Sequence, residues 1–209
     1  MKNIVLFFLL LFFSSIYAQT PSYKEKIITG ALKSYQENPK KITVGEKTFP
    51  VDCSNFVRAL YYQASGKDLF EESIQTKIYK KVTQDSFFGG SIGGVILFIL
   101  FKYRYQVDMK PEAGDIVFFD NTYDKNKNGK WDDPITHLGI VVEVMEDSTV
   151  VFIHGGTSKG INRGFLNLKK PSIYQKNGKI LNSYLQKTYG WNKGKEKLSG
   201  QLVRGFARF

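Results

Sequence analysis

Apolar residues dominate the start of the chain. Residues 4–13 are all apolar, Lys2 precedes them, and a short run that follows ends at Ala18. This order of a basic residue, an apolar core and a small residue is typical of a secretory signal peptide. We therefore expect residues 1–18 to be removed and the protein to be exported to the periplasm or beyond the cell. The rest, residues 19–209, has a length that fits one domain.

The next part of the chain has a helical pattern. Ser22 and Glu25 form a capping box at the start of a helix. The apolar residues expected on its inner face are Ile27, Ile28, Ala31, Leu32 and Tyr35. A second helix is expected to begin at Cys53 and to end near Gly66, because glycine commonly follows the last helical turn. Its core-facing residues are Phe56, Val57, Leu60 and Tyr61.

Three further segments lie around these helices. Residues 36–47 are expected to form a polar loop, and residues 69–82 a third helix. The uninterrupted apolar run 95–101 follows a glycine-rich stretch, 89–94. A membrane span needs about 20 residues, so this run is too short to cross a bilayer. It indicates a buried helix or strand, and a glycine-hinged lid over a cleft is the alternative.

The second half of the chain has the pattern of strands. Residues 111–115 read as a turn, and the glycines Gly155 and Gly156 and the segment 169–171 are expected to be loops. The expected strands are 116–119, 138–145, 149–154 and 202–209. Helices first and strands afterwards predict an α+β domain in which N-terminal helices pack on an antiparallel sheet.

The residues suited to nucleophilic chemistry are few. Cys53 is the only cysteine, and His137 and His154 are the only histidines. In an exported protein an unpaired cysteine suggests an intermolecular bridge or a reactive thiol. The alternative is a buried, inert side chain. The two histidines and the helix start beside the cysteine favour the reactive thiol.

A cysteine at the start of a helix has a defined set of possible partners. The unpaired N–H groups and the positive end of the helix dipole lower a thiol pKa and can hold an oxyanion, with the Cys53 amide as a candidate donor. His137 would then accept the thiol proton, and His154 would orient His137. The sequence therefore predicts a cysteine hydrolase that requires no cofactor for catalysis.

The two histidines can meet only if the turn between their strands has the right length. Side chains alternate between the faces of a sheet, so an even number of turn residues puts His137 and His154 on one face. A two-residue turn at Glu146 and Asp147 would place His154 opposite Gly139, diagonal to His137. A four-residue turn would keep the histidines on one face but place them further apart along the strands.

A polar segment just before His137 suggests a metal site. Oxygen-bearing side chains alternate over residues 124–133, with Gly129 at the sixth place, as in the first half of an EF-hand calcium loop. The candidate ligands are Asp124, Asn126, Asn128, the carbonyl of Lys130, and Asp132. Ile135 stands where the closing glutamate would be, and Asp133 is a substitute. The alternatives are a structural calcium site and an ordinary polar loop.

The charge of the chain bears on its partners. The formal net charge is +11, which favours anionic surroundings such as an envelope polymer, a membrane face or nucleic acid. A lysine-rich soluble surface is the alternative. No nucleic-acid motif is recognisable, and export argues against that partner. Tyr174, Tyr184, Tyr189 and Trp191 lie among lysines and could form a face that contacts a polymer. We expect a monomer without a membrane span.

Four segments, taken in order, resemble a known family. They are 52–57 (DCSNFV), 113–119 (AGDIVFF), 136–142 (THLGIVV) and 151–154 (VFIH). Together they look like the ordered motifs of the NlpC and CHAP superfamily of bacterial cell-wall cysteine hydrolases. The resemblance covers roughly residues 43–168, and four ordered motifs are more specific than one.

The resemblance has implications for fold and activity. It implies a papain-like fold, with Cys53 as nucleophile, His137 as base and His154 at the third, polar position. It also implies cleavage of amide bonds in peptidoglycan or muropeptides, by an endopeptidase or an amidase. Asn55 stands where many members have glycine, so the scissile bond stays open. Two alternatives are an envelope-binding module without activity and a superfamily member that acts on a lipid or another amide.

Overall fold

The computed structural model describes residues 21–84 and 92–208. The expected signal peptide and the glycines at 89 and 90 lie outside these ranges. The helices are α1 (Tyr23–Glu37), α2 (Cys53–Ser65), α3 (Leu69–Gln75), α4 (Ile78–Gln84), α5 (Ile92–Arg104) and α6 (Ser199–Leu202). The strands are β1 (Lys41–Val44), β2 (Lys47–Pro50), β3 (Gln106–Asp108), β4 (Ile116–Phe119), β5 (His137–Val144), β6 (Thr149–Thr157), β7 (Gly160–Asn167), β8 (Gln175–Lys176), β9 (Lys179–Ile180) and β10 (Val203–Arg208).

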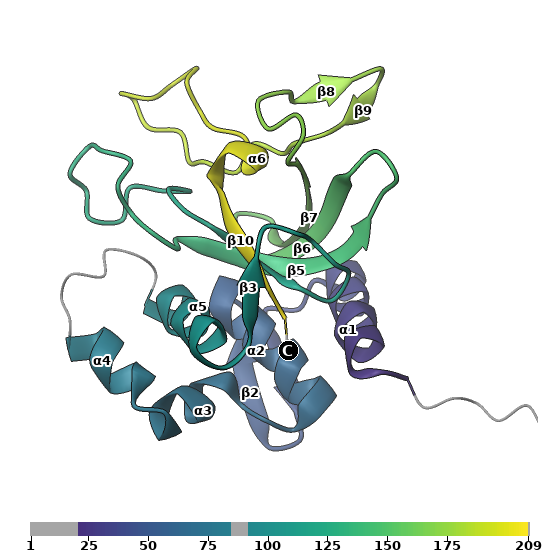
Figure 1. The fold of residues 1–209 in the computed structure, drawn as a ribbon, viewed down its shortest axis with the longest axis vertical. Coiled ribbons are helices and arrows are strands. Elements are labelled where there is room, and N and C mark those ends of the chain that lie inside the picture. Colours follow the sequence, from purple (N-terminus) through teal and green to yellow (C-terminus); the bar gives the residue numbers. More distant parts are fainter. Residues whose placement is uncertain (1–20, 85–91, 209) are drawn as a thin grey trace, which may run out of the picture.

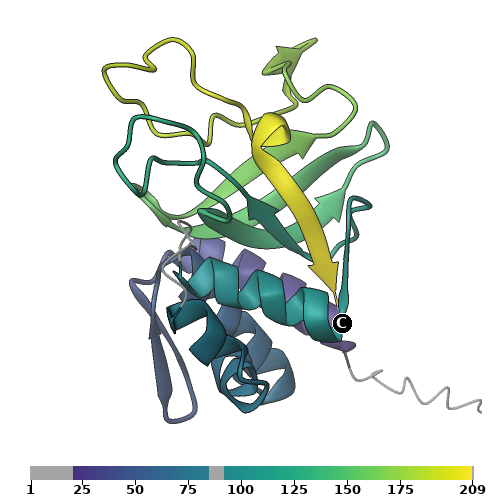
Figure 2. The ribbon, with the colours of Figure 1, turned by 60° about the vertical axis from the view of Figure 1, so that its left-hand side comes forward.

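A six-stranded sheet forms the centre of the fold. Its strand order is β3-β10-β4-β5-β6-β7, and each neighbouring pair is antiparallel. The helices α1, α2 and α5 lie below the sheet in Figure 1, whereas α6, the β8–β9 hairpin and long loops lie above it. Figure 2 shows the same three layers from the side. The predicted α+β class with an antiparallel sheet is confirmed.

Both faces of the sheet are covered, which explains the continuous apolar pattern of β4. Ile116 and Phe118 pack with the helices, while Val117 and Phe119 join a second cluster with Phe152 on the other face. Because successive side chains of a strand point to opposite faces, every side chain of β4 is buried.

The two helices predicted around residues 23–66 are confirmed. The Ser22 hydroxyl accepts a hydrogen bond from the Glu25 N–H, and the Glu25 carboxylate accepts one from the Ser22 N–H, so the capping box is formed. In α2 the four predicted core residues are buried and Gly66 is the C-cap. The buried stripe of α1 runs along positions 27, 30, 31 and 34. Leu32 lies about 100° around the helix from position 31 and is exposed, contrary to the expected inner face.

Three predictions about local structure were wrong. The expected polar loop 36–47 contains β1 and the start of β2, joined by a tight turn at Gly45, whose φ of 58° suits glycine. The expected third helix is divided into α3 and α4 because Lys77 has a φ of 61°. Gly155 and Gly156 belong to β6, which continues to Thr157 before β7 begins.

The apolar run 95–101 lies in α5 and belongs to the main core. Its buried residues are Val95, Ile96, Leu97, Leu100 and Phe101. The prediction of a buried helix or strand is therefore confirmed as a helix. Within residues 21–84 and 92–208, no helix combines the length and the apolar character that a bilayer crossing requires.

Candidate active site

The start of α2 places Cys53 over the end of β6. Asp52 is the N-cap, and its Oδ1 atom accepts a hydrogen bond from the Asn55 N–H at 2.7 Å. Gly156 passes directly beneath this turn: a Cβ atom there would lie 2.9 Å from the Cys53 nitrogen, and its φ is 72°. A larger residue at this position would push β6 away from the helix start.

Cys53 lies against the first residues of β5. The backbone N–H groups of Ser54, Leu138 and Cys53 itself act on the thiol and lower its pKa. Leu138 follows His137, the first residue of that strand. Cys53 is partly exposed. The fold thus brings together a helix start and a strand start that are more than eighty residues apart in the sequence.

The two histidines are in direct contact. The Nε2 atom of His137 lies 2.7 Å from the Nδ1 atom of His154, and the rings are nearly perpendicular, at 87°. His154 is 5% exposed and packs on Phe152, with 5.1 Å between ring centroids. Since Nε2 of His137 meets His154, Nδ1 is the ring nitrogen of His137 that remains for a thiol proton.

The histidines share a face for a different reason than the one predicted. The Met145 N–H donates to the Thr149 carbonyl, so residues 146–148 form the turn and their number is odd. Neither of the two even turns considered for this hairpin is formed. An odd turn alone would put the histidines on opposite faces.

A bulge in the hairpin restores the alternation. The pairing Ile140↔Ile153 and Val141↔Phe152 shifts by one residue at Glu143↔Val151. When the register of the first two pairs is extended by one residue, Gly139 lies opposite His154, which is the pairing expected from a two-residue turn. A Cβ atom on Gly139 would lie 3.1 Å from the His154 Cβ, so glycine leaves space for the imidazole.

Burial dominates the electrostatics of the site. It raises the pKa of the Cys53 thiol to about 12, and the Asp52 carboxylate adds to this effect, while the backbone N–H groups oppose it. The expected lowering of the thiol pKa by the helix start was therefore wrong. Burial, followed by the charge of Lys187, lowers the pKa of His137 to about 4. Burial, followed by His137, holds the pKa of His154 well below 6.5. At neutral pH all three groups are uncharged.

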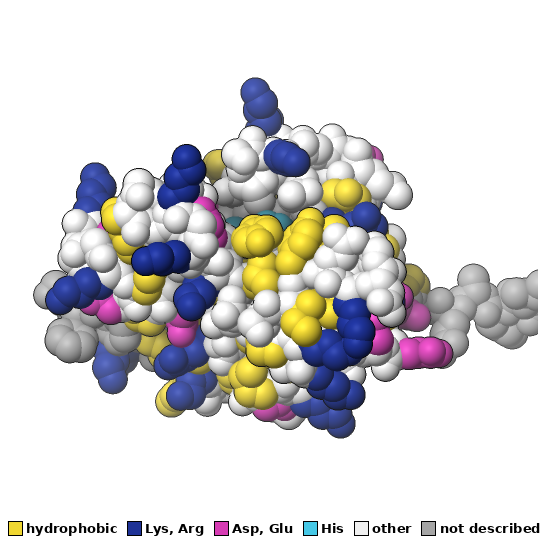
Figure 3. All heavy atoms as spheres, turned by 90° about the horizontal axis from the view of Figure 1, so that it is seen from above, with side chains coloured by type: hydrophobic (Ala, Val, Ile, Leu, Met, Phe, Trp, Pro, Cys, Tyr) yellow, Lys and Arg dark blue, Asp and Glu magenta, His cyan; other side chains and the backbone are white. Residues whose placement is uncertain are grey.

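Two residues beside the site carry no sequence signal that would have identified them. Tyr123 follows β4, and Lys187 lies in the loop before α6. The Lys187 Nζ atom lies 5.1 Å from the centroid of the Tyr123 ring. The pKa of Tyr123 is raised by burial and then by the charge of a Cys53 thiolate. Distant loops thus converge beside Cys53 and His137. Figure 3 shows histidine surface at the bottom of a hollow, flanked by hydrophobic side chains.

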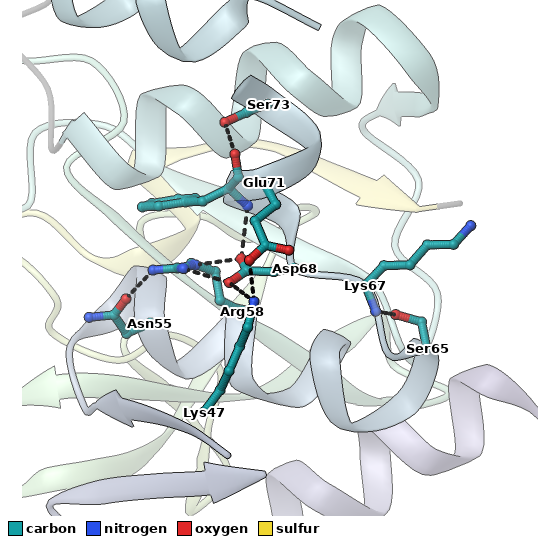
Figure 4. A network of polar contacts seen from close by, with 9 residues as sticks. Lys47, Asn55, Arg58, Ser65, Lys67, Asp68, Glu71 and Ser73 are labelled. Carbon is teal, nitrogen blue, oxygen red and sulfur yellow. Dashed lines mark hydrogen bonds and ion pairs between the residues drawn. The ribbon is translucent and has the colours of Figure 1, made fainter. Parts of the chain in front are cut away.

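A polar network fixes α2 behind Cys53. Asn55 donates from Nδ2 to Asp52 and accepts at Oδ1 from Arg58, both at 2.8 Å. Arg58 in turn donates two hydrogen bonds to Asp68, the N-cap of α3, and Lys47 approaches the same carboxylate (Figure 4). Asn55 therefore links the cap of the cysteine helix to a buried ion pair.

The candidate calcium loop is held by its own hydrogen bonds. Both Asp124 oxygens accept from backbone N–H groups, those of Asn128 and Gly129. The side-chain amides of Asn126 and Asn128 donate to Asp132. Across the described ranges, no three His, Cys, Asp or Glu side chains converge as metal ligands.

The two ends of this loop are joined by hydrogen bonds beside His137. Thr122 bonds through its N–H and its hydroxyl to the Thr136 hydroxyl, at 2.8 and 2.9 Å. Asp133 is fully buried, and its Oδ1 atom has no hydrogen-bond partner among the residues that the structure describes. The loop therefore contains a buried carboxylate oxygen without a hydrogen-bond partner, at a residue that precedes His137 in the same segment.

A cavity of about 580 Å³ lies elsewhere, on the helical side of the sheet. It is lined by Tyr23, Lys24, Ile27, Tyr61, Ser65, Lys67, Tyr105, Gly114 and Arg208. None of these is a candidate catalytic residue. Comparison with protein-family models, curated proteins and solved structures gives no significant match.

The raised pKa of the Cys53 thiol predicts how fast this side chain is alkylated. At pH 7, iodoacetamide is expected to alkylate Cys53 more slowly in the folded protein than in the urea-unfolded chain, where the thiol pKa is about 8.5. In the folded protein the rate should rise about tenfold per pH unit from pH 7 to 10, because only the thiolate reacts. Mass spectrometry of timed samples measures both rates. A rate already constant above pH 5 would indicate a resting thiolate instead.

Proposed function

We propose that this protein is an exported cysteine hydrolase that cleaves amide bonds of peptidoglycan. Cys53 is the nucleophile, His137 the base and His154 the residue that orients the base. The observation that carries the proposal is the 2.7 Å contact between the two histidines, at the start of a strand whose Leu138 N–H lowers the pKa of the Cys53 thiol. The papain-like fold and the family resemblance belong to the same proposal.

The mechanism assigns each ring nitrogen a task. His137 donates its Nε2–H to the Nδ1 of His154, which is free to accept because burial keeps His154 neutral. The Nδ1 of His137 then accepts the thiol proton as the Cys53 sulfur bonds to the amide carbonyl carbon. Because the thiol is protonated before the substrate binds, its proton must leave during the attack. His137 is therefore required to accept this proton.

The remaining steps complete the hydrolysis. The carbonyl oxygen becomes an oxyanion at the start of α2, where the Cys53 N–H can donate to it. His137 returns its proton to the leaving amine, and the carbon–nitrogen bond breaks to leave a thioester. Water, deprotonated by His137, attacks the thioester, and the released sulfur regains the proton.

The choice of peptidoglycan rests on three features. The four ordered motifs resemble those of cell-wall hydrolases, the start of the chain has the pattern of a signal peptide, and the net charge of +11 suits an anionic envelope polymer. Cleavage within the stem peptide and cleavage between sugar and peptide both agree with these features. The protein therefore acts as an endopeptidase or an amidase.

Digestion of purified peptidoglycan tests the function. The wild-type protein is expected to release soluble fragments, and their masses identify the broken bond. Cys53→Ala should release none while its melting temperature shows that it remains folded. If wild type and Cys53→Ala give the same fragments, the proposed function is wrong. Binding without release would favour the envelope-binding module, and thiol-dependent hydrolysis of lipid amides alone would favour the other enzyme class.

Calcium is proposed as a structural ion in the loop before His137. Asp124, Asn126, Asn128, the Lys130 carbonyl and Asp132 would hold it, and the unpartnered oxygen of Asp133 fits a further contact. An ion that binds only the folded state must raise the melting temperature as its concentration rises.

We expect calcium to raise the melting temperature and a chelator to reverse the change. Asp124→Ala combined with Asn126→Ala should remove this response, as differential scanning fluorimetry would measure. Asn177→Ala, in the turn between β8 and β9, is a control that should respond as the wild type does. If neither calcium nor the chelator changes the melting temperature, the segment is an ordinary polar loop.

A further inference from the structure

Three aromatic rings gather at the surface beside the candidate active site. Trp131 comes from the loop between β4 and β5, while Tyr189 and Trp191 come from the loop between β9 and α6. The ring centroids of Trp131 and Trp191 are 4.8 Å apart. Tyr189 and Trp191 are 5.7 Å apart and almost parallel, at 7°. We call these three residues the aromatic platform.

The two loops are fixed to each other close to the site. The Gln186 side chain donates to the Asn121 carbonyl at 3.0 Å, and the Lys187 N–H donates to the Thr122 carbonyl at 2.7 Å. Asn121 also exchanges hydrogen bonds with Asp133 inside the first loop. These contacts tie the platform to the segment that leads into His137.

The platform also lies close to the reacting groups. Lys187 stands two residues before Tyr189, contacts the Tyr123 ring, and acts electrostatically on His137. Tyr123 is influenced by the charges of both Cys53 and Tyr189. The loops that carry the platform therefore border the candidate active site, where a polymer bound at Cys53 can reach them.

Exposure of the platform requires an explanation. Trp191 is 47% exposed although it contacts two other rings. Clustered aromatic side chains left open to solvent typically mark a binding surface. Tyr174 and Tyr184 form a separate pair, 5.2 Å apart, so the four aromatic residues that lie among lysines in the sequence divide into two groups.

We propose that Trp131, Tyr189 and Trp191 bind the glycan strand of the substrate by stacking against its pyranose rings. This inference rests on the proposed function. An aromatic face carries partial negative charge, which suits the polarised C–H groups on the flat side of a sugar ring. The indole N–H and phenol O–H groups at the ring edges can bond to sugar hydroxyls.

The charges around the platform agree with this ligand. Lys130, Lys193 and Lys195 are exposed beside the three rings in the sequence, and Figure 3 shows basic side chains spread over this side of the molecule. Peptidoglycan strands carry stem peptides with free carboxylates, which these lysines can pair with. The platform therefore binds the sugars while the flanking lysines attract the anionic peptides.

Binding to peptide-free glycan strands tests the proposal directly. Cys53→Ala protein is incubated with strands stripped of their stem peptides, and binding is measured by calorimetry. Trp191→Ala in the same background should weaken binding about tenfold, through lost stacking and lost apolar burial. Trp191→Phe, which retains an aromatic face, should restore part of it. Tyr103→Ala is the matched control, because Tyr103 is 73% exposed on α5 and forms no aromatic cluster within residues 21–84 and 92–208.

The outcomes separate this inference from the proposed function. Trp191→Ala in the otherwise wild-type protein should slow digestion of intact peptidoglycan more than digestion of a small, soluble muropeptide. Equal glycan binding by Trp191→Ala and Tyr103→Ala would overturn the platform even if Cys53-dependent digestion is observed. Trp191-dependent glycan binding without any digestion would support the platform and overturn the hydrolase. Binding to free stem peptides but not to glycan would overturn the platform as well.

Discussion

Replacing His137 by alanine is expected to lower peptidoglycan turnover by about 10²–10⁴-fold. Because burial keeps the Cys53 thiol protonated at neutral pH, with a pKa of about 12, attack depends on a base that takes its proton. Alanine offers none. The residual rate should approach that of Cys53→Ala, as measured by release of soluble fragments under identical conditions.

His154 is expected to respond differently to substitution. Glutamine at this position keeps a carbonyl oxygen that can accept the Nε2–H of His137, so His154→Gln should retain measurable turnover. His154→Leu removes the acceptor and should lie much closer to His137→Ala. Circular dichroism and melting curves control for folding. If all three folded variants lose activity equally, His137 and His154 have no separate roles as base and orienting residue.

The pH profile follows from the same groups. Protonated His137 cannot accept the thiol proton, and its pKa lies at about 4 instead of 6.5. Activity of the wild type should therefore persist as the pH falls through 6 and decline only near pH 4. A decline centred near 6.5 would mean that His137 is solvated like a free imidazole.

The largest effect on stability is expected at Asp68. Its side chain is 5% exposed and holds Arg58, which is 16% exposed, through two hydrogen bonds (Figure 4). Asp68→Ala removes the N-cap of α3 and leaves the Arg58 charge without its main partner. We expect a loss of about 2–4 kcal/mol in the free energy of unfolding. In a domain of this size the melting temperature should fall by roughly 5–12 °C.

Glu71 provides the matched control for Asp68. It pairs with Lys47 in the same network, but its side chain is 60% exposed, so Glu71→Ala should cost less than about 1 kcal/mol. Burial alone would raise the pKa of Asp68, yet the hydrogen bonds from Arg58 and Phe70 keep it below 3.8. The contribution of this carboxylate is therefore present at neutral pH and lost as the pH falls through its lowered pKa. Equal melting temperatures for the two variants would contradict this account.

Local signals in the sequence were sufficient for several elements of the fold. The capping box at Ser22, the glycine stop at Gly66 and the apolar strand 116–119 each act within a few neighbouring residues, and the structure confirms all three. The break at Lys77 and the hairpin at Gly45 were missed. Each depends on one residue with a positive φ inside a pattern that otherwise reads as helix or loop.

The sequence by itself determined the candidate chemistry. One cysteine at a helix start and two histidines beside apolar strands can be read without a structure. Only the tertiary structure decided how these groups meet and in which state. A bulge in the β5–β6 hairpin corrects an odd turn and brings the imidazoles within 2.7 Å. The burial that results raises the thiol pKa, which the helix start alone would lower. Register and burial arise from contacts between distant segments, and so no local pattern encodes them.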